Sequence, residues 1–304
     1  MQPIIHTVHD SRTGTWQYIV ACPNTLQAAI IDPVLDFDPA TFSISTESAD
    51  SLLGLAASKG YAIAYLLETH AHADHLSASY YIQQTLQATG SPRAPICIGN
   101  KIRTVQDIFA QKYDIPSAEL DAAFDRLFET GEQFQIGDVA VRVLHLPGHT
   151  PDHIGYLIQD EGVVTGDSIF NPDLGSARCD FPGGDARALY KSMKTLLDLP
   201  PHYKLYTGHD YPPAAADGQG KSRQPVPCVT VAEQRERNKH AKQDSTEEEF
   251  VSWRSDRDQS LNEPRLIHQA LQVNARGGRM PKRTHNGKVF FDFLVAVPDR
   301  LVGC

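Results

Sequence analysis

The 304-residue sequence lacks the features of a membrane or secreted protein. No run approaches the roughly 20 apolar residues of a membrane span. The amino terminus has neither the basic start nor the apolar core of a signal peptide. We therefore expect a cytoplasmic protein with no membrane partner.

Cysteine is also sparse, and its spacing does not suggest disulfide pairs or a metal-binding motif. The five cysteines are scattered and odd in number, at Cys22, Cys97, Cys179, Cys228 and Cys304. No Cys-x-x-Cys pair occurs among them. This argues against a disulfide framework and a zinc ribbon, and it fits a reducing compartment.

Positive charge is in deficit, with 28 Lys and Arg against 37 Asp and Glu and a net charge of −9. No basic block offsets this locally, so nucleic acid is not an expected partner. One or two buried arginines could still hold an anionic small molecule. A composition of 41% hydrophobic and 21% charged residues is that of an ordinary globular protein.

Histidine, in contrast, is concentrated in one stretch, Thr-His-Ala-His-Ala-Asp-His at 69–75. In an extended segment, residues two apart point to the same side, so His70, His72 and Asp74 can converge while His75 follows as the chain turns. A single histidine is most simply a structural residue. A cluster of imidazoles and a carboxylate away from water is costly unless it holds a cation. The stretch therefore predicts a metal site.

Hydrophobic periodicity places this cluster between a buried strand and a helix. Strands are expected within 4–31 and at 61–67, 95–99, 133–146, 154–159, 162–165 and 203–207. Helices are expected at 49–59, 76–87, 102–112, 185–199, 230–242, 247–257 and 265–273, with Asp74 as the cap of the second. We expect a loop at 34–50 and a final apolar segment at 286–297, and the pattern does not assign residues 113–130 to a helix or a strand.

Four of these strands end beside a residue able to bind metal, namely His70, His149, Asp167 and His209. Such regular placement predicts one shared site at one edge of a sheet sandwich flanked by helices. After Pro212 the composition shifts to a Pro-, Ala- and Gly-rich stretch followed by charged helical segments. We expect a catalytic domain at 1–212 and a C-terminal segment packed on it at 213–304.

The candidate ligands number seven: His70, His72, Asp74, His75, His149, Asp167 and His209. With Asp167 as a bridge they could hold two zinc or iron ions that activate water for hydrolysis. Two histidines and one carboxylate could instead hold a single Fe(II), leaving positions open for dioxygen and substrate. Spacing alone does not choose between these arrangements.

Several neighbours of these ligands have a weaker signal. Asp152, His153 and Asp210 could orient the ligands, although structural roles are the simpler interpretation. Cys179 lies near the expected site, and an inert thiol is favoured over a nucleophile. No serine or cysteine has a nucleophile-elbow setting, so covalent catalysis is not expected.

Together, the 69–75 motif, Pro-Gly-His-Thr at 147–150, Gly-Asp at 166–167 and Gly-His-Asp-Tyr at 208–211 resemble the metallo-β-lactamase fold superfamily. This resemblance implies an α/β (α+β) fold, an αββα sandwich with the metal site at one edge. The segments 166–170 and 177–186, and the tail at 230–238 and 271–276, resemble the bacterial branch of the persulfide dioxygenases. The resemblance covers nearly the whole chain.

The resemblance implies one non-heme Fe(II) per chain, held by His70, His149 and Asp167, with the site lined by His72, Asp74, His75 and His209. The implied reaction oxidises glutathione persulfide with dioxygen to sulfite and glutathione, in sulfide detoxification. Arg178 and Tyr211 match residues near the substrate, and a salt bridge from Arg178 to Asp180 or Asp185 is the alternative. A homodimer and a sulfurtransferase partner are further expectations.

The main rival is a two-metal thioester hydrolase similar to glyoxalase II, which needs all seven ligands and also acts on glutathione conjugates. A lactonase or β-lactamase is a more distant alternative. A persulfide-responsive binding protein without catalytic activity is disfavoured, because no ligand has been lost.

Overall fold

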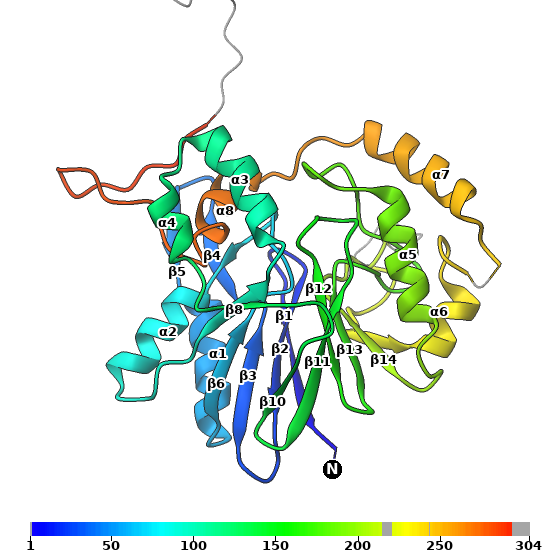
Figure 1. The fold of residues 1–304 in the computed structure, drawn as a ribbon, viewed down its shortest axis with the longest axis horizontal. Coiled ribbons are helices and arrows are strands. Elements are labelled where there is room, and N and C mark those ends of the chain that lie inside the picture. The colour runs from blue at the N-terminus through cyan, green and yellow to red at the C-terminus, as the bar shows by residue number, and fades with distance from the viewer. Residues whose placement is uncertain (1, 215–220, 243, 294–304) are drawn as a thin grey trace, which may run out of the picture.

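The computed structural model describes residues 2–214, 221–242 and 244–293 (Figure 1). Two six-stranded sheets face each other, and helices cover both outer faces, so the predicted αββα sandwich is confirmed. In the view of Figure 1, α1, α2, α3, α4 and α8 lie on one side of the sandwich, and α5, α6 and α7 lie on the other.

The first sheet has the order β1-β2-β3-β6-β8-β9. Its strands are β1 Ile4–Asp10, β2 Thr15–Ala21, β3 Gln27–Ile31, β6 Ala62–Leu67, β8 Ile96–Gly99 and β9 Arg126–Phe128. The second sheet has the order β10-β11-β12-β13-β14-β15. Its strands are β10 Gln133–Ile136, β11 Val139–His145, β12 Ile154–Ile158, β13 Gly162–Gly166, β14 Lys204–Thr207 and β15 Cys228–Thr230.

A small third sheet joins β5 (Ser43–Ser45), β4 (Val34–Asp38) and β7 (Leu76–Ser77). The helices are α1 Glu47–Ser58, α2 Ser79–Ala88, α3 Ile102–Tyr113, α4 Ser117–Asp121, α5 Ala186–Leu197, α6 Val231–Arg237, α7 Glu247–Gln259 and α8 Ile267–Asn274. No helix of the described residues is long and apolar enough to cross a bilayer.

Strand β2 shows why the sandwich forms. All seven of its residues are buried, and alternate side chains point to opposite faces of the sheet. Tyr18 and Val20 pack in the core between the two sheets, while Ile19 and Ala21 pack in the core beneath the helices of the first sheet. An apolar strand buried on both faces needs a layer on each side.

Two local predictions were wrong, and one segment that the sequence left unassigned contains regular structure. The 34–50 segment is not a loop, because β4 and β5 form a hairpin within it and β4 also pairs with β7. Asp74 does not cap a helix, since α2 begins only after the short strand β7 and its cap is Ala78. The stretch 113–130 holds α4 and β9, whose few residues give a weak periodic signal.

The segment after Pro212 packs on both outer faces. Val231 and Phe250 contribute to the apolar cluster around α5, and Ile267 and Leu271 contribute to the cluster that includes α3. The predicted domain boundary at 212 stays a prediction. The apolar segment expected at 286–297 has no helix or strand up to residue 293, and 294–297 lie outside the described residues.

Candidate metal centre

Four of the predicted ligands meet at one edge of the sandwich. His70 follows β6, His149 follows β11, and Asp167 and His209 follow the parallel pair β13 and β14. Asp167 Oδ2 lies 4.0 Å from His70 Nε2, 3.6 Å from His149 Nε2 and 3.5 Å from His209 Nε2. The strand ends therefore place one carboxylate among three imidazoles that are distant in sequence.

The other three candidates lie on the loop between β6 and β7. His72, Asp74 and His75 each offer a donor atom, and these atoms lie within 4.8 Å of one another. Asp74 Oδ2 lies 3.1 Å from His209 Nε2, which connects this loop to the strand-end residues. The structure thus brings all seven candidates together, and their role as metal ligands stays a prediction.

Each of four imidazoles is anchored through one ring nitrogen, so that the other nitrogen faces the cluster. The anchors are His70 Nδ1 to Thr69 Oγ1 (2.9 Å), His72 Nε2 to Asp32 Oδ1 (3.1 Å), His149 Nδ1 to Arg178 O (2.7 Å) and His209 Nδ1 to Thr15 Oγ1 (3.3 Å). Metal-binding histidines in proteins are oriented in this way through the nitrogen that does not bind the metal.

Several donor atoms at the centre of the cluster are buried without a partner among the described residues. They are His70 Nε2, His72 Nδ1, His75 Nε2 and Asp167 Oδ1. Each buried polar atom left unpaired costs about 1–3 kcal/mol. A bound cation would remove this cost, and nitrogen with carboxylate oxygen is a donor set suited to zinc or iron. The residues present therefore fit the implied metal.

The sequence left open a site for one metal and a site for two metals, and the structure contains enough ligand atoms for either. The donor atoms of His70, His149 and Asp167 lie within 4.8 Å of one another, as a triad for a single metal requires. Asp167 also lies between these residues and His209, in the place of a bridging ligand. With Asp74 and His75 nearby, a second metal would find its own ligands.

Burial and charge prepare these groups for metal binding. Burial, followed by the neighbouring His72, lowers the pKa of His70 well below its usual value, so this imidazole stays neutral. Burial opposes the charged form of Asp74, but His209 and His75 outweigh it and lower the pKa of that carboxyl. A neutral imidazole and an ionised carboxylate are the forms that bind a cation.

Three residues that hold the ligand loop were missed by the sequence analysis: Asp32, Glu68 and Asn274. Asp32 accepts hydrogen bonds from Thr69 N (2.7 Å) and Thr69 Oγ1 (2.8 Å). Glu68 Oε2 lies 3.5 Å from His72 Nε2, and Glu68 Oε1 accepts from Ser79 Oγ at 2.5 Å. Asp32 directly follows strand β3, and Glu68 directly follows β6 and precedes the histidines. These positions at strand ends were the only sequence indication that the two acids lie near the site.

Asp152, His153 and Asp210, which the sequence marked only as possible supports of the ligands, have two different kinds of contact. Asp152 Oδ2 accepts from Ala71 N (2.8 Å), and His153 Nε2 accepts from Asp167 N (2.9 Å), so both contact the ligand-bearing backbone. Asp210 instead pairs with Arg223 at 2.6 Å. Asp210 therefore has the structural role.

A glycine is needed at position 208, because the backbone that follows β14 passes very close to Gly166 and Asp167 at the end of β13. A Cβ at this position would collide with Asp167 Oδ1 and would lie 3.0 Å from the carbonyl carbon of Gly166. The absence of a side chain lets His209 and Asp167 lie side by side.

A cavity of about 1030 Å³ opens on the metal centre and includes Asp74, His149, Asp167 and His209 in its wall. Arg178 and Tyr211 also line it. The Tyr211 ring lies parallel to that of His209, with 5.3 Å between ring centroids. Arg178 forms the alternative salt bridge with Asp180 and donates to Asn262 O at 2.8 Å. The substrate-binding role of Arg178 and Tyr211 stays a prediction.

Six cationic residues lie in the cavity wall: Arg12, Arg178, Lys239, Arg254, Arg257 and Arg265. Three of them pair with acids outside the wall, namely Arg12 with Asp36, Arg178 with Asp180 and Arg254 with Asp258. The other three, Lys239, Arg257 and Arg265, are the groups of this wall that could bind an anionic ligand.

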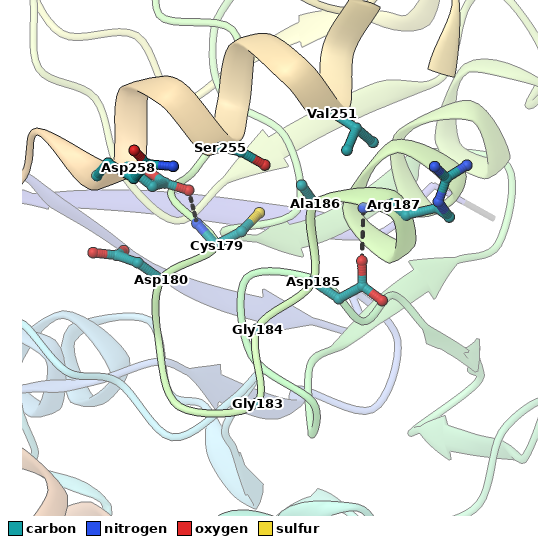
Figure 2. A pocket seen from close by; sticks show the side chains of 11 residues that line it. Cys179, Asp180, Gly183, Gly184, Asp185, Ala186, Arg187, Val251, Ser255 and Asp258 are labelled. Atoms are coloured by element: carbon teal, nitrogen blue, oxygen red, sulfur yellow. Dashed lines mark hydrogen bonds between the residues drawn. The ribbon is translucent and has the colours of Figure 1, made fainter. Parts of the chain in front are cut away.

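Cys179 lines a second cavity of about 700 Å³, together with Asp258 and Ser255 of α7 (Figure 2). Its backbone N–H donates to Asp258 Oδ2 at 2.9 Å, as the dashed line shows. Burial raises the pKa of the Cys179 thiol, and Asp258 acts in the same direction. A neutral, buried thiol is a poor nucleophile, which supports the interpretation as an inert residue.

Sequence comparison finds relatives along nearly the whole chain. The beta-lactamase hydrolase-like protein of Xylella fastidiosa is 41% identical over 96% of this chain. This chain spans 64% of that relative's length. Glyoxylase B2 of Dictyostelium discoideum is 38% identical over 93% of this chain and 94% of its own length. Bovine mitochondrial persulfide dioxygenase ETHE1 is 26% identical over 68% of each chain.

Among solved structures, ETHE1 from Myxococcus xanthus superposes with a TM-score of 0.70 and 27% identity, covering 91% of this chain and 100% of its own. The model of the metallo-beta-lactamase superfamily matches residues 11–209, which contain all seven candidate ligands. The sandwich, the site at its edge and this match agree, and the chain belongs to the metallo-beta-lactamase superfamily.

Proposed function

We propose that this protein is a metal-dependent hydrolase that cleaves the thioester of an anionic thiol conjugate of the glutathione type. The observation that carries the proposal is the complete set of seven donors, with Asp167 between His149 and His209. Relatives that span most of this chain and bear glyoxylase and hydrolase names support the same reaction.

In such a site, bound zinc or iron lowers the pKa of a coordinated water and polarises the thioester carbonyl. The protein's own residues fix the geometry. The anchored nitrogens of His70, His72 and His149 hold these rings in place before metal binds. In the overall reaction, water adds to the carbonyl carbon, the C–S bond breaks, and the thiol leaves with a proton.

The cavity wall supports an anionic substrate. Lys239, Arg257 and Arg265 line it, and none of the three forms a salt bridge within 4.0 Å of a described acidic residue, although Arg265 interacts electrostatically with Asp38. A glutathione conjugate carries two carboxylates, and arginine binds carboxylates through paired N–H donors. These side chains would bind the tripeptide while the metal centre acts on the group attached to sulfur.

Persulfide oxidation is the second candidate, and a specific observation favours it. The Myxococcus ETHE1 structure covers 91% of this chain, including much of the C-terminal segment. The donor atoms of His70, His149 and Asp167 also form a complete triad for one Fe(II). This reaction would use the same cavity and the same class of thiol.

Metal content and two assays distinguish the candidates. The protein is purified anaerobically, its metals are measured, and it is given a glutathione thioester and, separately, glutathione persulfide in an oxygen electrode. Two metals per chain with thioester hydrolysis and no oxygen uptake support the hydrolase. One iron per chain with oxygen uptake and sulfite release would assign the dioxygenase instead.

A further inference from the structure

The backbone loop that bears four of the candidate ligands has little regular structure of its own. Residues 70–75 belong to no helix or strand. Buried backbone groups in such a loop need partners from elsewhere in the fold. Asn274, at the end of α8 in the C-terminal segment, supplies two of these bonds and a third to the adjoining strand β7.

Both polar atoms of the Asn274 side chain form hydrogen bonds with backbone groups of residues 72–77. Its Nδ2 donates to His72 O at 2.7 Å and to His75 O at 2.8 Å. Its Oδ1 accepts from Ser77 N at 2.8 Å. Asn274 is 4% exposed, so water does not replace these bonds. One amide therefore fixes the backbone of two candidate ligands and the last residue of β7.

The position of Asn274 is itself fixed. Ala275 O accepts from Gln106 Nε2 on α3 at 2.9 Å, and Arg276 Nε pairs with Glu119 on α4 at 2.7 Å. Gly278 has a positive φ and passes close to Ser77, where a Cβ would lie 3.0 Å from Ser77 O. The turn after α8 is thus docked against the first sheet's helices.

A second element of the C-terminal segment holds another ligand. Asp258 of α7 accepts from Cys179 N (Figure 2). Arg254, on the same helix, donates to Ala177 O at 3.3 Å. The carbonyl between them, that of Arg178, accepts from His149 Nδ1 at 2.7 Å. The α7 residues therefore support the backbone that orients His149.

We infer that Asn274 and Asp258 are positioning residues of the metal centre, through which the C-terminal segment sets metal affinity. This inference rests on the metal site of the proposed function and on neither of its two reactions. Groups that orient metal ligands typically change metal affinity 10–100-fold when they are replaced.

The test measures Co²⁺ binding by visible absorption, without substrate. Asn274→Asp keeps the acceptor for Ser77 N, removes both donors and places a carboxylate against two carbonyl oxygens. Its matched control is Gln272→Glu, the same change in a buried amide of α8 that bonds to His268 O and Asp292 O instead. We expect the Co²⁺ Kd to be 10–100-fold higher for Asn274→Asp and for Asp258→Ala, which removes the acceptor for Cys179 N, and unchanged for the control. Activity of Asn274→Asp should recover as free metal is raised.

Equal Co²⁺ affinity in wild type and Asn274→Asp would overturn the role of Asn274, and equal affinity in Asp258→Ala would overturn that of Asp258. If a variant does not fold, the wild-type protein provides the test by reciprocity. Metal should then slow hydrogen exchange of the α8 amides as well as those of 70–77. Unchanged exchange of α8 on metal addition would refute the inference.

Discussion

Asp167 and His209 end two neighbouring parallel strands, and Asp167 Oδ2 lies 3.5 Å from His209 Nε2. A second contact, 3.1 Å, joins His209 Nε2 to Asp74 Oδ2. His209 thus lies on the side of Asp167 where a second metal would be held, and it is the residue whose replacement best separates one metal from two.

We expect His209→Ala to lower the metal content from two ions per chain to about one, because the second site loses a ligand while His70, His149 and Asp167 remain. Thioester hydrolysis should fall with the metal count. Metal analysis by mass spectrometry after equilibrium dialysis measures this. A variant that keeps the wild-type metal content would exclude His209 as a ligand.

Asp167→Ala should abolish metal binding and activity together, since this carboxylate lies at the centre of the cluster under either arrangement. The loss should be about 10²–10⁴-fold, the rate equivalent of several kcal/mol of Lewis-acid stabilisation. Asp160→Asn is a suitable control, because the exposed Asp160 lies in the turn before β13, at the opposite end of that strand from Asp167. Substantial activity in Asp167→Ala would refute the ligand assignment.

Removal of metal should destabilise the folded protein. At a free metal concentration of about 100 Kd, binding contributes about 2.7 kcal/mol. For a chain of 304 residues, with an unfolding entropy of about 2.1 cal/mol/K per residue, the loss corresponds to a fall in Tm of about 4 °C. Thermal unfolding with and without a chelator measures this. An identical Tm in both conditions would show that the buried donor atoms hold no metal under those conditions.

Replacing Arg178 should weaken substrate binding more than it slows the chemistry. Arg178→Ala removes a charged hydrogen-bond donor from the cavity wall, which predicts a KM about 10–100-fold higher. Because Arg178 is already paired with Asp180, the variant Asp180→Asn tests whether that pairing is needed to orient it. An unchanged KM in Arg178→Ala would assign the residue to structure alone.

The Glu119 pair near α8 predicts a pH dependence of stability. Burial opposes ionisation of Glu119, but Arg276 and Lys282 outweigh it and lower the pKa of this carboxyl. A lowered folded-state pKa stabilises the protein above the unfolded value, near 4.5, and this stability is lost as the pH falls through the folded value. Glu119→Gln should therefore destabilise at pH 7 and have little effect at low pH. Urea unfolding at several pH values provides the measurement.

The sequence alone predicted the αββα sandwich and the seven residues that meet at its edge. Each of His70, His149, Asp167 and His209 comes within a few residues of the end of an apolar run that the sequence predicts as a strand. Residues that follow strands in this way can meet at one edge of a sheet, so their common site could be predicted. Tertiary structure decided the rest.

Strand β4, in the 34–50 hairpin, also pairs with β7, which lies about 40 residues further along the chain, and no local sequence pattern reveals such a pairing. Asn274 reaches His72 across 202 positions, and Asp32 reaches it across 40. Such contacts depend on how helices and strands pack, so residue types and spacing identify the ligands, whereas only the folded chain shows what holds them in place.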